Sequence, residues 1–146
     1  MREEILAYKR ERILEEAVKL FYARGFTATT LDDIAAELGV TKPFIYTHFR
    51  SKVELLAALC KPTIEMSMQA VTEAAAQPGT PTARLQRAVA DFTKVVLRRQ
   101  ANIAIYFREE KHLSKDALDE INALRKQFDH ALSDLLREGV KAGEFH

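Results

Sequence analysis

Apolar residues recur three or four positions apart along most of the chain, and no segment alternates apolar and polar residues as a strand would. This spacing predicts an all-α fold. The first helix is expected to end near Arg24, with Gly25 as a left-handed C-cap. Its apolar face consists of Ile13, Leu14, Ala17, Val18 and Phe21. Later helices are expected over residues 31–38, 42 to about 49, 52 through at least 71, about 83–99, about 102–110 and 115 to about 141. Pro62 is expected to kink or divide the helix that begins at residue 52.

Capping residues mark two short helices in the first third of the chain. Thr30 and Asp33 have the spacing of a capping box, and Gly39 ends the helix that they begin. Thr41 then caps the next helix, with Pro43 in its first turn. Two short helices separated by one glycine turn are typical of a helix-turn-helix, whose second helix enters the major groove of DNA.

The second of these helices divides into two faces. Ile45 and Phe49 are four residues apart and are expected to pack inward. The remaining side chains, which include basic and aromatic residues, are expected on the exposed faces: Lys42, Pro43, Phe44, Tyr46 and Thr47. Exposing Phe and Tyr beside basic residues is costly for a solvated helix, and favours a helix that contacts DNA.

Charge adds local information that the net value of +1 hides. Residues 1–60 carry nine basic and nine acidic side chains, whereas residues 39–52 carry three basic side chains and no acid. A short basic window is what phosphate contact requires, although a solvated helix face is the alternative interpretation of this charge alone.

The segment from Thr29 to Lys52, TTLDDIAAELGVTKPFIYTHFRSK, resembles the DNA-binding domain of TetR/AcrR-type transcriptional regulators. The resemblance extends back to Ile13 and forward to Leu56, and residues 60–146 loosely resemble the family's helical ligand domain. It implies a helix-turn-helix domain over 1–52 and a helical ligand-binding and dimerisation domain over 53–146. It also implies a ligand-responsive regulator, by family default a repressor. Such a regulator binds palindromic double-stranded operator DNA and is released by a small lipophilic or acyl-CoA-like effector. The single cysteine and the charged N-terminus, which is not a secretory signal, separately favour a reducing cytoplasm.

The resemblance also implies roles for individual residues. Thr30 would cap its helix and donate to a phosphate, and the side chains of Tyr46, His48 and Lys52 would bind phosphates. The residues facing the bases would be Thr41, Lys42, Pro43 and Phe44, with Thr47 on the same exposed surface. Phe44 replaces the small residue that is common in the family, and an aromatic ring there fits packing on thymine methyl groups. The alternatives are structural: Thr41 only caps, His48 packs between helices and Tyr46 covers the rim of the core.

The ligand domain offers fewer signals. Candidate pocket residues are Met66, Phe92, Tyr106, Phe107 and Phe128, because methionine and aromatic side chains suit adaptable apolar pockets. The same residues at helical spacing also fit an ordinary core. Pro62 is either a flexible joint between the two regions or a harmless kink.

Other chemistry is not expected. The sequence has no Gly-rich phosphate loop, nucleophile elbow or metal-ligand cluster, so we expect neither an enzyme nor a bound cofactor or metal. His112 is expected at the surface. Cys60 is a lone cysteine that we expect to pack in the interior, and no apolar run has membrane-spanning length. The rival hypothesis is a helical small-molecule- or protein-binding module that does not read DNA.

Relatives in this family usually continue past the seventh helix with two more helices that build the dimer. Two subunits are needed to place recognition helices in successive major grooves, about 34–36 Å apart. Because residues 143–146 follow the seventh helix closely, we expect either a fragment of a longer homodimeric regulator or a member that dimerises through another surface.

Overall fold

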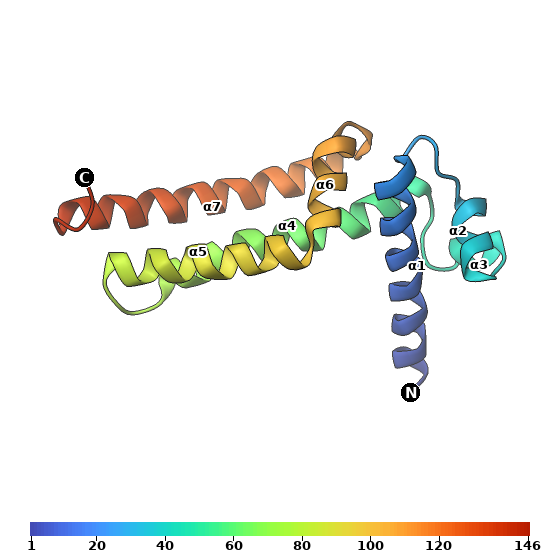
Figure 1. Cartoon of the computed structure of the whole chain (residues 1–146), viewed down its shortest axis with the longest axis horizontal. Helices are drawn as coiled ribbons and strands as arrows, with labels where there is room; N and C mark the ends of the chain where they lie inside the picture. The colour runs from blue at the N-terminus through green and yellow to red at the C-terminus, as the bar shows by residue number, and fades with distance from the viewer. The chain divides into compact units, whose positions relative to one another are not determined.

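The computed structural model describes residues 1–146 and contains seven α-helices, one short 3₁₀-helix and no strand, which confirms the all-α class (Figure 1). The helices are α1 (Arg2–Arg24), α2 (Leu31–Leu38), α3 (Lys42–Tyr46), α4 (Lys52–Ala76), α5 (Pro81–Arg98), α6 (Gln100–Glu109) and α7 (Lys115–Lys141), with η1 (Glu110–His112) between the last two. No helix combines the length and the apolar character that crossing a membrane would require.

The chain folds into two compact units that divide inside α4, between Lys61 and Pro62. The first unit comprises residues 1–61 and 101–115, and the second comprises residues 62–100 and 116–146. The domain boundary expected at residue 52 stays a prediction, since these units also exchange segments later in the chain.

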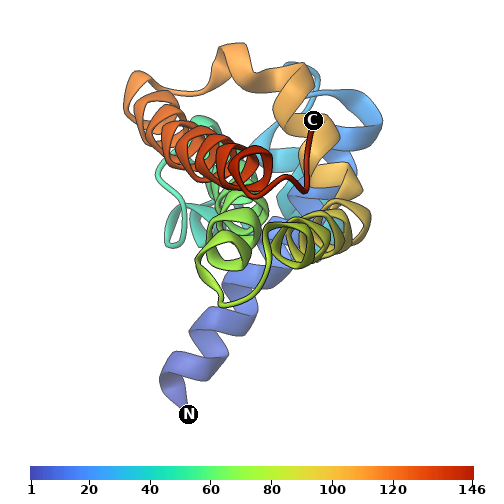
Figure 2. The same ribbon diagram turned by 90° about the vertical axis from the view of Figure 1, so that its left-hand side faces the viewer.

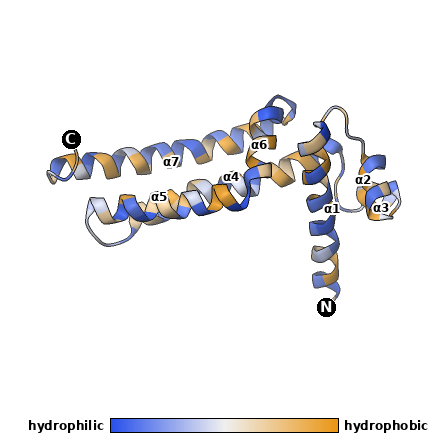
Figure 3. Ribbon diagram, in the orientation of Figure 1, coloured by the Kyte–Doolittle hydropathy of each residue, from blue (hydrophilic) through white to orange (hydrophobic).

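The first unit is built around the apolar faces that the sequence pattern indicates. Ile13 and Phe21 of α1, Ile34 of α2 and Ile45 of α3 are completely buried. Leu55 and Leu56 of α4 and Ile105 of α6 complete the centre of this core. Hydrophobic and hydrophilic residues alternate around each long helix, as the spacing of three and four requires (Figure 3).

The second unit consists of three helical segments, from α4, α5 and α7, that run side by side and are seen nearly end-on in Figure 2. Val71 and Ala74 of α4 pack against Ala88 of α5. The rings of Phe92 and Phe128 and the side chain of Leu132 lie against this cluster. Near the C-terminal ends of α4 and α7, Arg84 of α5 donates to the carbonyl of Ala75 at 2.8 Å and pairs with Glu138.

The capping residues act as predicted, with one exception. Thr30 and Asp33 form a complete capping box, Gly39 is left-handed with φ 68°, and Thr41 accepts from the N–H of Phe44. The C-cap prediction for Gly25 is wrong: its φ of 90° and ψ of 162° are outside the left-handed helical region. This positive-φ extended conformation still favours glycine, and it turns the chain so that Phe26 enters the core.

Three helix boundaries differ by two residues or more from the sequence prediction, and one of them is the start of α6 at Gln100 rather than near Asn102. The third helix ends at Tyr46 rather than near Phe49, because the Thr47 hydroxyl donates to the Phe44 carbonyl (2.6 Å) and His48 N–H donates three residues back to Ile45 (3.0 Å). This tighter turn carries Phe49 into the core. The fifth helix begins two residues earlier than expected, with Thr80 as its N-cap.

Pro62 does not divide α4, which is continuous from residue 52 to 76. A proline has no N–H, so the carbonyl of Ala58, four residues earlier, loses its usual helical partner. The neighbouring carbonyl, that of Leu59, accepts a hydrogen bond from the Asn102 side chain at 3.0 Å. A side chain of α6 therefore supports the helix where its own ladder is interrupted.

Candidate nucleic-acid interface

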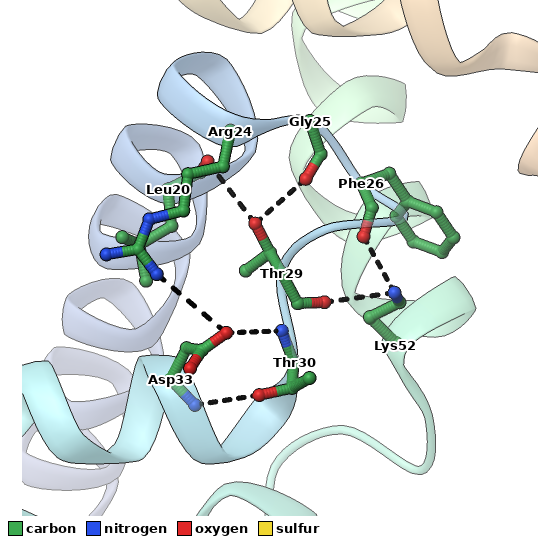
Figure 4. Close-up of polar contacts among 8 residues, drawn as sticks. All are labelled: Leu20, Arg24, Gly25, Phe26, Thr29, Thr30, Asp33 and Lys52. Carbon is green, nitrogen blue, oxygen red and sulfur yellow. Dashed lines mark hydrogen bonds and ion pairs between the residues drawn. The ribbon is translucent and has the colours of Figure 1, made fainter.

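The interface begins at the N-terminus of α2, where a reciprocal capping box fixes the first turn. The Asp33 N–H donates to the Thr30 hydroxyl oxygen at 3.0 Å, and the Thr30 N–H donates to the Asp33 carboxylate at 2.9 Å (Figure 4). Hydrogen bonds to the Asp33 carboxylate from the Thr30 N–H and then from the Thr30 side chain, with a smaller contribution from the Arg24 charge, lower the pKa of Asp33. The Thr30 side chain is exposed.

The loop that leads into α2 is held by two residues that sequence reasoning did not assign to it. The buried Thr29 hydroxyl lies between two carbonyl acceptors, Gly25 at 2.8 Å and Leu20 at 3.3 Å. From α4, the Lys52 ammonium donates to the carbonyls of Phe26 (2.7 Å) and Thr29 (3.0 Å), as Figure 4 shows. It also lies 4.1 Å from the centre of the Phe26 ring.

This geometry gives Lys52 a role that the sequence did not reveal. Its ammonium neutralises no carboxylate but binds the electronegative ends of two peptide groups in the loop. The phosphate contact implied for Lys52 stays a prediction, and at most one of its three N–H donors is left for it.

The exposed face of α3 is arranged as predicted. Ile45 and Phe49 are buried, whereas Thr41, Lys42, Pro43, Tyr46 and Thr47 are exposed. Lys42 lies 3.7 Å from Asp32 of α2, an exposed pair that contributes little to stability and is easily exchanged for a phosphate or a base.

Phe44 and His48 differ from the rest of the face because both are only half-buried. Their rings make an edge-to-face contact with centroids 5.3 Å apart. Burial, and then the charges of Arg10 and Lys9, lower the pKa of His48. The imidazole is therefore neutral near pH 7, and in the free protein it can offer a phosphate an N–H but no charge.

The end of α6 is attached to this unit at the C-terminus of α1. Arg108 donates to the carbonyls of Phe21 and Tyr22 in the last turn of α1, where the Phe21 carbonyl also accepts the N–H of Gly25. The buried Glu109 carboxylate accepts from the N–H of Phe26. His112 was expected at the surface, but it is half-buried and stacks on the Phe26 ring with centroids 4.7 Å apart.

Cys60 is buried as expected. Burial, with a further contribution from the Glu109 charge, raises the pKa of its thiol to about 12. The thiol is therefore protonated at neutral pH and is a packing group rather than a nucleophile.

The candidate ligand residues are divided between the two units. Phe92 and Phe128 contact each other in the second unit, with ring centroids 6.3 Å apart. Met66 is exposed in that unit, beside a shallow hollow of about 360 Å³ whose lining includes charged side chains. In the first unit Tyr106 is buried, whereas Phe107 is 70% exposed. The pocket prediction therefore remains best founded for Phe92 and Phe128.

Comparison with known proteins identifies the family. Residues 13–59 match the family of bacterial regulatory proteins of the tetR type, and residues 78–146 match the tetracyclin repressor-like C-terminal domain. The crystal structure of the TetR-family regulator PfmR from Thermus thermophilus is 31% identical and superposes with a TM-score of 0.85, covering 92% of this chain and 74% of PfmR. The chain belongs to the TetR family, and it is a transcriptional regulator.

Three further relatives show how much of each chain the similarity covers. The repressor KstR2 from Mycolicibacterium smegmatis is 27% identical over 140 residues, which are 95% of this chain and 68% of KstR2. The KstR2 structure from Mycobacterium tuberculosis is 28% identical with a TM-score of 0.82, covering 92% of this chain and 69% of that one. YerO from Bacillus subtilis is 47% identical, but over 60 residues that are 41% of this chain and 21% of YerO. Identity is therefore higher over a short segment than over the whole chain.

Replacing Lys52 tests the loop anchor. Lys52→Met keeps the aliphatic stem but removes the ammonium, so the Phe26 and Thr29 carbonyls lose a charged donor. We expect a loss of about 1–3 kcal/mol in the free energy of unfolding, measured by urea denaturation. Lys19→Met on the exposed side of α1 is the control and should change it by no more than about 0.5 kcal/mol. Equal losses in the two variants would contradict the anchoring role.

Proposed function

We propose that this chain is a cytoplasmic repressor that binds palindromic operator DNA as a homodimer through α3. The observation that carries the proposal is the exposed face of α3, where Lys42, Tyr46 and Thr47 surround the half-buried Phe44 and no carboxylate of the helix intervenes. Relatives named as transcriptional repressors, such as KstR2, support the direction of regulation.

The division of labour on this face follows from chemistry. Lys42 and Thr41 at the start of α3 are placed to meet base edges, since the N-terminal residues of a recognition helix enter the groove first. Tyr46, His48 and Thr30 supply neutral hydrogen-bond donors for phosphates, which fix register without reading sequence. Pro43 has no N–H and contributes shape.

We further propose that a small lipophilic or acyl-CoA-like effector releases the DNA by binding in the second unit. Phe92 and Phe128 support an apolar site there, because both rings are half-buried against Val71, Ala74 and Ala88 and retain uncovered surface. The division of the chain at Pro62 supports a joint in α4, between the effector unit and the DNA-binding unit.

Selection from a random pool of duplex DNA, with the whole chain at moderate salt, tests the DNA proposal. We expect enrichment of a palindrome whose half-sites lie about one helical turn apart, bound with an affinity that falls steeply with salt. Enrichment of single half-sites would contradict the homodimer. An absence of any enrichment would favour the rival, a helical binding module that does not read DNA.

The reading role of Phe44 predicts sensitivity to thymine methyl groups. In the enriched duplex, replacing thymines one at a time by deoxyuridine removes only the C5 methyl group. At one position we expect binding by the unsubstituted protein to weaken several-fold, whereas Phe44→Ala should bind both duplexes equally. Equal sensitivity of the two proteins would show that Phe44 does not read a methyl group.

If α4 has a joint at Pro62, replacing this proline should change effector-induced release of DNA without changing DNA affinity. Pro62→Ala restores the missing N–H and stiffens α4, so operator affinity should be retained while release becomes weaker. Release is measured on the enriched duplex with a series of straight-chain acyl-CoAs, and free coenzyme A is the control ligand. If an acyl-CoA releases the unsubstituted protein and the Pro62→Ala variant from DNA equally well, the joint is contradicted. If no acyl-CoA releases the unsubstituted protein from DNA, this effector class is contradicted.

A further inference from the structure

The N-terminal half of α1 brings two cations to the side of the recognition helix. The Lys9 ammonium lies 5.8 Å from the centre of the Phe44 ring, and the Arg10 guanidinium lies 4.7 Å from the centre of the Phe49 ring. Both side chains are exposed, and both contact aromatic rings rather than carboxylates. By contrast, Arg12 pairs with Glu15 at 3.3 Å.

These residues precede the segment 13–59 that matches the tetR family. Sequence analysis did not assign them a role either, because their distance from residue 44 along the chain hides their proximity to α3. The helical structure of α1 from Arg2 onward is what places them there.

A hollow of about 340 Å³ separates α1 from the helix-turn-helix at this point. Lys9 and Arg12 supply its charged rim, and Ile13, Leu38, Val40 and Phe44 supply its apolar wall. A cationic rim beside an apolar wall suits a sugar–phosphate backbone, whose phosphate is anionic and whose deoxyribose has apolar faces.

We propose that the DNA interface extends from α3 onto the N-terminal half of α1, where Lys9 binds a backbone phosphate. The inference rests on the proposed function, because it needs Phe44 to face the duplex. In the free protein the Lys9 ammonium lies near the ring face of Phe44. When DNA binds, it exchanges this exposed cation–π contact for a charge-assisted hydrogen bond to a phosphate oxygen.

The arrangement also explains how Phe44 is kept in place before DNA arrives. Lys9 contacts its ring from α1, and His48 contacts it from the turn that follows α3. A side chain held by neighbours on two segments is oriented in advance, which lowers the entropy cost of reading a base.

The salt dependence of DNA binding tests the role of Lys9. The whole chain and its variants are titrated with the duplex enriched by selection, and the logarithm of the association constant is plotted against that of the salt concentration. Lys9→Gln should lower the steepness of this plot by about one, the effect expected for one lost phosphate contact. Affinity for all duplexes should weaken by a similar factor, so the sequence preference stays unchanged. Lys9→Arg should restore the slope.

Lys19→Gln is the matched control. It removes the same charge from the same helix, at an exposed position ten residues and about 15 Å further along the axis. Its slope should equal that of the unsubstituted protein. Circular dichroism should show equal helicity in all variants, since Lys, Arg and Gln have similar helix propensities.

Three outcomes would overturn the inference. An unchanged slope for Lys9→Gln would show that Lys9 contacts no phosphate. Equal reductions of the slope for Lys9→Gln and Lys19→Gln would show that only the net charge of the protein matters. Both would leave the proposed DNA binding intact. Absence of binding by the unsubstituted chain would instead overturn the proposed function, and this inference with it.

Discussion

The helix-turn-helix of this regulator depends on how the loop between α1 and α2 is held. Lys52 donates to the carbonyls of Phe26 and Thr29, and its ammonium lies against the Phe26 ring. The Thr29 hydroxyl ties the same loop back to the end of α1. Because α2 starts directly after Thr30, the position of the loop determines where α2 begins and where the turn to α3 can point. A cation from α4 thus sets the geometry of a surface formed by residues 30–48.

The loop is held from a second direction by α6. Glu109 of α6 accepts the Phe26 N–H, and Lys52 of α4 donates to the Phe26 carbonyl. The two peptide groups on either side of Phe26 are therefore hydrogen-bonded to two different helices. Arg108 binds the last carbonyls of α1, and His112 stacks on the Phe26 ring. Both α4 and α6 also contain residues of the second unit, so the loop is held by two helices that the units share.

Contacts between residues close together in the sequence were predictable, and contacts between residues far apart in the sequence were not. The capping box of Thr30 and Asp33, the bounds of α2 and the inward direction of Ile45 and Phe49 depend on neighbours within four residues, which a sequence displays directly. The roles of Lys52 and His112 depend on partners at least 23 residues away, which hydrophobic spacing does not identify. The end of α3 was missed because the Thr47 hydroxyl competes for a backbone carbonyl, a choice that tertiary packing of Phe49 decides. The ligand residues were the least predictable, since an aromatic side chain at helical spacing fits a core and a pocket equally well.

The five residues of α3 are too few to sustain a helix by themselves, since isolated helices shorter than about 12–15 residues are marginal in water. Its helical conformation is therefore stabilised by the rest of the first unit, through the buried side chains of Ile45 and Phe49 and the N-cap Thr41. An isolated peptide of this segment would not hold the conformation that presents its outer side chains. Moving those side chains to a longer helix would keep their order but change the directions in which they point. The arrangement of the exposed side chains of α3 is thus a property of the whole first unit.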